Sequence, residues 1–208
     1  LNIPCALFRW IYKVGKGIWD GSLCFRAVSA LGGATFFFTG AFLAVMLLVP
    51  HDSWNNMYAF VGVVGLFVLF ALGSAARPSH RLEMVELGPY LTLFMGFVCY
   101  ALLTSISTRL SLRFFIFHLT AFLLALLVVS SVKRYEQLQL IAVLAVAGLT
   151  VAALYGCYQG VVGVDVVANQ QDMAVNAGMP GRVYSFFDNP NNFAELLVML
   201  TPLTFALF

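Results

Sequence analysis

The residues with the clearest potential for chemistry lie in one segment, 181–197, with the sequence GRVYSFFDNPNNFAELL. Arg182 is the only Lys or Arg between positions 160 and 191, and it precedes the expected start of a helix. A helix start offers backbone N–H groups and a positive dipole end, and a guanidinium grips two phosphate oxygens in a planar fork. The pattern indicates a phosphate or pyrophosphate site, or else an arginine that only anchors the chain at the lipid headgroups.

The helix start itself has two interpretations. Asn189 can cap the helix, with Pro190 at the first helical position. Alternatively, Asn192 is the cap and Glu195, three residues later, completes a capping box. In the second interpretation Glu195 belongs to the helix start, and this does not exclude a role in binding. We take Arg182 and four nearby residues as the candidate substrate-binding set: Asn189, Asn191, Asn192 and Glu195.

Other polar groups at membrane depth are few. His118, Gln159 and Glu195 all fall toward the side of the bilayer that holds the long segment 160–191. Each such group is costly in a membrane unless it finds a partner or water. For His118 we favour packing with a hydrogen bond to a neighbouring helix over a role as catalytic base.

The composition shows which elements must position these residues. Of 208 residues, 62% are apolar and only 10% charged, with a mean hydropathy of +0.93. Soluble domains are about 45–50% apolar and about 25% charged, so the chain is an integral membrane protein. The four cysteines show no metal-ligand spacing, and we expect neither a metal nor a cofactor. A net charge of +2 does not argue for a nucleic-acid partner.

A bilayer core of about 30 Å needs about 20 apolar residues in a helix. Five runs meet this length, and a sixth starts at Asn192 and is still apolar at Phe208. The predicted fold is therefore all-α, a polytopic bundle of about six transmembrane helices, and we expect the chain to be the front part of a longer protein. The five complete runs are Ala27–Val49, Met57–Ala75, Tyr90–Ile106, Leu112–Val132 and Leu138–Tyr158.

Cations set the expected orientation. With the N-terminus inside, the cytoplasmic segments hold eight Lys and Arg residues and the opposite side holds three, Arg109, Arg113 and Arg182. This places the N-terminus in the cytoplasm and the loop 160–191 outside it. Residues 1–26 carry apolar residues at spacings of three and four, which predicts a cytoplasmic amphipathic helix in the membrane interface. A solvated tail is the alternative. The remaining predicted regions are 27–159, with five helices, and 192–208, with the start of the sixth.

The segment resembles the start of the domain shared by O-antigen ligases and polymerases. The resemblance rests on Arg182, Ser185-Phe186-Phe187, Asn189-Pro190-Asn191 and Phe193-Ala194-Glu195-Leu196-Leu197. That family's pattern is approximately R-x-x-(G/S)-(T/L/F)-F-x-N-P-N-x-(F/L)-(A/G)-x-(Y/L)-L. The usual glycine is Ser185 here, and the frequent tyrosine is Leu196. The motif covers about 16 residues, and the rest of the chain agrees only in hydropathy and order.

This resemblance implies a multi-pass glycosyltransferase in the bacterial plasma (inner) membrane, active in cell-surface polysaccharide biosynthesis. Its expected partners are a glycan donor linked to undecaprenyl pyrophosphate, a glycan or lipid acceptor, and membrane lipids. The arginine at the position of Arg182 is expected to hold the donor pyrophosphate. The catalytic base is expected beyond residue 208, so we predict that these 208 residues alone do not catalyse transfer. Two rival functions are a transporter or flippase for a lipid-linked sugar and a non-catalytic membrane subunit.

Overall fold

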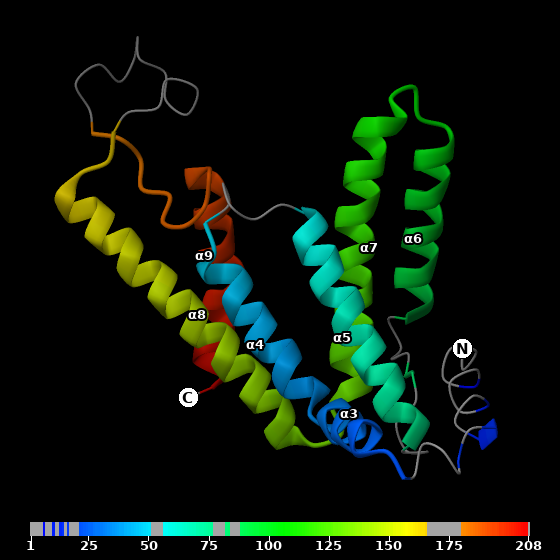
Figure 1. Cartoon of the computed structure of the whole chain (residues 1–208). Coiled ribbons are helices and arrows are strands. Elements are labelled where there is room, and N and C mark those ends of the chain that lie inside the picture. Colours follow the sequence, from blue (N-terminus) through cyan, green and yellow to red (C-terminus); the bar gives the residue numbers. More distant parts are fainter. Residues whose placement is uncertain are drawn as a thin grey trace. The chain divides into compact units, whose positions relative to one another are not determined.

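The computed structural model describes residues 6, 10, 13–14, 16, 21–50, 56–76, 82–83, 88–165 and 180–207. Within these residues it contains helices and no strands (Figure 1), which confirms the all-α prediction. The elements from residue 21 onward are α3 (Leu23–Gly33), α4 (Thr35–Leu48), α5 (Asn56–Ala76), α6 (Gly88–Leu103), α7 (Thr108–Ser131), α8 (Tyr135–Val162) and α9 (Pro190–Ala206).

Three of these helices, α5, α7 and α8, are long and apolar enough to cross a membrane. The pair α3 and α4 makes a fourth candidate if the two are counted as one span. The helix α6 is apolar but has 16 residues, and α9 has 17. Together with the composition, these helices identify a membrane protein.

The first predicted span, Ala27–Val49, is not one straight helix. It is divided at Ala34 into α3 and α4, which are bent by 65°. Gly32 lies directly against α5: a Cβ added to it would come within 2.4 Å of the Cα of Gly73. This backbone contact holds α3 on α5, and the Thr35 hydroxyl donates 2.7 Å to the Gly32 carbonyl at the bend. The glycines around the break are also poor helix formers.

The chain forms two compact units. The first comprises residues 1–39 and 56–138, in which α5 packs against α3 and α7, and α6 packs against α7. Its most deeply buried side chains include Val63, Phe70 and Leu127. The second comprises residues 40–55 and 139–208. There, α4 and α8 meet through small residues, since a Cβ on Gly148 would lie 3.2 Å from the Cα of Ala44.

Several predicted boundaries shift. The helix α8 continues to Val162, so the predicted loop 160–191 begins three residues later, and residues 166–179 of it lie outside the described residues. The sixth helix starts at Pro190, two residues before the predicted Asn192. Most of the predicted interfacial segment 1–26 also lies outside the described residues.

Candidate functional site

The candidate site is built on the start of α9. Asn189 caps the helix, because its side-chain oxygen accepts a 2.8 Å hydrogen bond from the backbone N–H of Asn191. Pro190 occupies the first helical position and is buried. This confirms the first of the two predicted helix starts.

The alternative helix start, with Asn192 as the cap, is wrong. Asn192 already lies in the first turn of α9, where its side-chain amide donates 3.3 Å to the Asp188 carboxylate. Glu195 lies in the second turn and is exposed, so it cannot close a capping box. The helix starts earlier because Pro190 is preorganised for the first helical position and needs no N–H there.

The segment before α9 is fixed to α8 by one buried amide. Gln159, 8% exposed, accepts hydrogen bonds from the backbone N–H groups of Ser185 (2.7 Å) and Tyr184 (3.3 Å). Its Nε2 donates to the Ser185 carbonyl at 3.2 Å. The Ser185 hydroxyl in turn donates to the carbonyl of Ala152 at 2.6 Å. Four hydrogen bonds therefore hold this turn on α8.

Ser185 has a left-handed backbone, with φ of +55°. This conformation costs an L-residue roughly 1–2 kcal/mol, and it persists here because the surrounding hydrogen bonds fix the turn. The turn also lets the chain reverse between Val183 and Phe187, both of which pack against the same apolar cluster.

Aromatic side chains also pack this segment against α8. Phe187 and Phe193 are buried beside Ala152, with their ring centroids 6.0 Å apart. A Cβ on Gly156 would come within 2.8 Å of the Phe193 ring, so the glycine lets α9 approach α8 closely. Phe186 stacks on Tyr155 with centroids 4.6 Å apart. These aromatic contacts hold the start of α9 firmly on α8, and we call this packed region the aromatic platform.

On this platform Arg182 is exposed and reaches the first turn of α9. Its Nη2 donates a 2.7 Å hydrogen bond to the side-chain oxygen of Asn191. Arg182, Asn189 and Asn191 are therefore brought together, and Asn192 lies in the same turn. The Glu195 side chain makes no hydrogen bond or ion pair with them within the described residues. Of the five predicted binding residues, Glu195 is the one set apart.

The chemistry available here is anion binding. A guanidinium presents five N–H donors in a planar fork, and one donor of Arg182 is directed at Asn191. The backbone N–H of Asn192, in the first turn, makes no hydrogen bond within the described part of the chain. Within the same part, no group of three or more His, Cys, Asp or Glu residues could hold a metal ion.

His118 belongs to the other compact unit. Its Nδ1 lies 2.7 Å from the Phe114 carbonyl, and its ring packs 5.7 Å from the ring of Phe94 on α6. The ring does contact a neighbouring helix, but the predicted hydrogen bond to such a helix is wrong. The imidazole instead uses the carbonyl one turn earlier on its own helix.

Ser185 and the bonding role of Gln159 were not part of the predicted site. For Gln159, the signal available in the sequence was its position as a glutamine at the end of an apolar run. Nothing in the sequence alone marks a serine as left-handed.

The chain was also compared with known proteins. No protein family, curated protein or solved structure matches it.

Proposed function

We propose that this chain is part of an integral membrane glycosyltransferase that ligates or polymerises glycans carried on undecaprenyl pyrophosphate. The observation that carries the proposal is the guanidinium of Arg182 held at the first turn of α9. The reaction takes place at the extracytoplasmic face of the bacterial plasma membrane. Arg182 binds the donor pyrophosphate and stabilises the charge that develops as this group leaves.

The geometry suits a pyrophosphate in two ways. Arg182 and the N–H of Asn192 offer donors from a side chain and from the backbone at one helix end, where the dipole favours negative charge. Asn191 orients the guanidinium through the 2.7 Å hydrogen bond. Because Gln159 and the aromatic platform hold the segment in place, these donors need little reorganisation to meet an anion.

The local roles of the motif residues give further support. Asn189 caps α9, Pro190 opens it and Asn191 contacts the arginine. Ser185, where the O-antigen ligase and polymerase pattern carries glycine or serine, has the positive φ that glycine adopts without strain. The motif thus corresponds to one local structure rather than to scattered residues.

We further propose the topology that this activity requires. The N-terminus lies in the cytoplasm, six helices cross the membrane, and the loop before α9 faces outward with Arg182 near the headgroups. The part of this reaction that we assign to the residues described above is donor binding. The acceptor is a second glycan or a lipid.

The same hydrogen bond also favours a second role, in which Arg182 only braces the start of α9. The two roles differ in what an Arg182 substitution changes. A brace contributes to thermal stability, whereas a donor site contributes to affinity. Arg182→Lys separates them further, since lysine keeps the charge but loses the planar fork.

The test is binding of undecaprenyl pyrophosphate to the chain in nanodiscs, with the unfolding temperature measured in parallel. Charge-assisted hydrogen bonds contribute about 1.5–3 kcal/mol, so Arg182→Ala should weaken binding roughly 10- to 100-fold. Arg182→Lys should also weaken it, and Arg134→Ala, at an exposed arginine of the other unit, should not. If Arg182→Ala lowers the unfolding temperature but leaves the affinity unchanged, Arg182 only stabilises the start of α9 and the donor-site proposal is refuted.

A further inference from the structure

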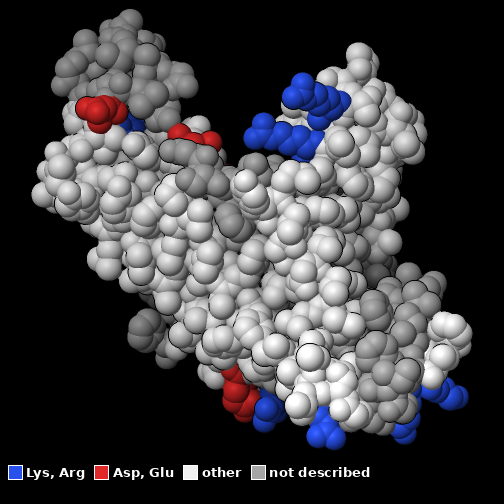
Figure 2. Space-filling view, viewed as in Figure 1, with Lys and Arg blue, Asp and Glu red and all other residues white. Residues whose placement is uncertain are grey.

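A second basic site lies at the start of α7, in the compact unit that does not contain Arg182. Arg109 and Arg113 are one turn apart in the first two turns of this helix, and both are exposed. Figure 2 shows basic side chains near the end of this unit where α6 meets α7, and further basic side chains at its opposite end. Arg109 and Arg113 are the described cations at the first of these ends.

The placement of the two arginines is electrostatically unfavourable. Cations are disfavoured near a helix N-terminus, and like charges four residues apart repel each other. Within the described residues neither guanidinium has a hydrogen bond or an ion pair. Beyond the other end of α7, by contrast, Lys133 is 2.7 Å from the Glu83 carboxylate. The start of α7 therefore presents two positive charges that an anion would stabilise.

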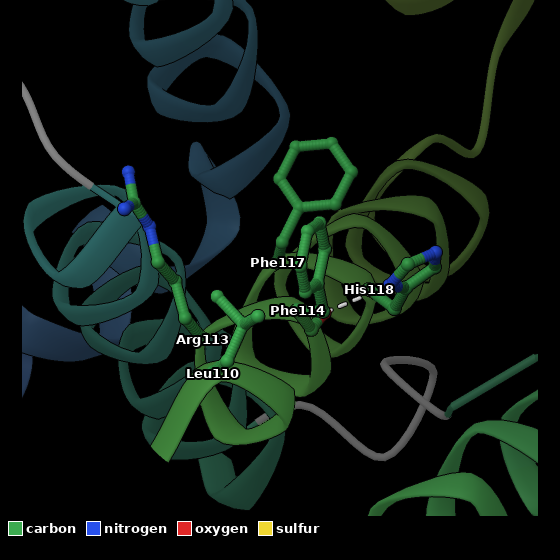
Figure 3. A pocket seen from close by; sticks show the side chains of 5 residues that line it. All are labelled: Leu110, Arg113, Phe114, Phe117 and His118. Atoms are coloured by element: carbon green, nitrogen blue, oxygen red, sulfur yellow. Dashed lines mark hydrogen bonds between the residues drawn. The ribbon is translucent and has the colours of Figure 1, made fainter. Parts of the chain in front are cut away.

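The surface around these arginines is hollowed and apolar. A cavity of about 510 Å³ is lined by Leu110, Arg113, Phe114, Phe117 and His118 (Figure 3). In this view Arg113 and His118 lie on either side of the two phenylalanines. A second cavity, of about 170 Å³, is lined by Arg109 and Arg113 with Met57, Leu112 and Ile116. Arg113 lines both.

We propose that Arg109 and Arg113 bind the phosphate of an anionic phospholipid whose hydrocarbon chain lies along Phe114 and Phe117. A free phosphate ion would gain nothing from the apolar lining, whereas a lipid uses both parts of the site. Phe114 and Phe117 follow Arg113 along α7 and are 59% and 54% exposed. Since this helix is long and apolar enough to span a bilayer, these two side chains face hydrocarbon. The arginines sit at its end, at the depth of the headgroups.

The two arginines are the part of this surface that selects among lipids. Arginine recognises phosphate oxygens through paired N–H donors, so a lipid with a zwitterionic headgroup should bind less well than an anionic one. The inference is independent of the proposed function, because all of its residues lie in the unit 1–39 and 56–138. Loss of one site would leave the other intact.

The test is a titration of the purified chain in detergent with phosphatidylglycerol, and separately with phosphatidylcholine of the same acyl chains. Native mass spectrometry counts the bound lipids. The site variant is Arg109→Gln/Arg113→Gln, and each single variant is measured as well. The matched control is Arg26→Gln/Arg134→Gln, which removes the same charge from two exposed positions elsewhere in the unit. Circular dichroism checks the helical content of each protein.

We expect phosphatidylglycerol to bind about tenfold or more tightly than phosphatidylcholine, as charge-assisted bonds imply. The site variant should lose this preference, each single variant should lose part of it, and the control should keep it. Equal binding of the two lipids, or an unchanged preference in the site variant, would overturn the proposal. Displacement of the lipid by excess inorganic phosphate would also overturn it, since the site would then recognise the free ion.

Discussion

Replacing Gln159 by alanine removes three hydrogen bonds at once. The amide contacts Ser185 N–H at 2.7 Å, Tyr184 N–H at 3.3 Å and the Ser185 carbonyl at 3.2 Å. Alanine leaves these backbone groups without partners in a position where Gln159 itself is 8% exposed. Water therefore has poor access to replace the lost bonds.

The size of the effect follows from these contacts. At about 0.5–1.5 kcal/mol net for each hydrogen bond, the loss is about 3 kcal/mol. A chain of this length loses about 2–4 °C in unfolding temperature for each kcal/mol, so we expect a decrease of about 6–12 °C. Because the turn positions Arg182, affinity for undecaprenyl pyrophosphate should fall as well.

The assay is thermal unfolding in detergent, followed by tryptophan fluorescence or circular dichroism. The matched control is Gln139→Ala, which removes an exposed glutamine from the same helix. An unfolding temperature for Gln159→Ala equal to that of Gln139→Ala would refute our explanation of how the turn is held. Gln159→Glu is a further check, since it replaces the donor to the Ser185 carbonyl with a second oxygen and should also destabilise.

Three further predictions concern backbone positions, each read out as unfolding temperature. Gly32→Ala should destabilise strongly, because its Cβ would lie 2.4 Å from the Cα of Gly73. Gly65→Ala, with open space around it, should not destabilise in this way. Equal effects of the two substitutions would contradict the α3–α5 contact. Ser185→Gly should be more stable than Ser185→Ala by about 1 kcal/mol, because both lose the hydroxyl but only glycine relieves the left-handed strain; the reverse order would contradict this. Asn189→Ala should cost about 1 kcal/mol through loss of the cap, and no change would argue against it.

The sequence predicts the helical fold well because length and hydropathy alone decide it in a membrane. The ends of α5 lie within one residue of the predicted run Met57–Ala75. The break at Ala34 was missed, since it depends on Gly32 meeting Gly73, a contact between residues far apart in the chain. The hydropathy of an apolar run does not indicate which of its glycines contacts another helix.

At the candidate site, the local chemistry was predictable and the tertiary contacts were not. The Asn189 cap follows from Asn-Pro, whose preferences act over neighbouring residues. The bond from Gln159 to Ser185 joins residues 26 positions apart, and no local preference reports it. The bond from Arg182 to Asn191 likewise depends on how the intervening turn folds back.

The most direct measurement is glycan transfer by the protein that carries these residues, from an undecaprenyl-pyrophosphate-linked donor to its acceptor, with and without Arg182→Ala. We expect transfer to fall by roughly one to two decades at normal expression, as the loss of charge-assisted bonds to the pyrophosphate implies. Arg182→Lys should be impaired as well, because lysine lacks the planar fork. Full transfer by the Arg182→Ala protein would contradict a donor site at the start of α9.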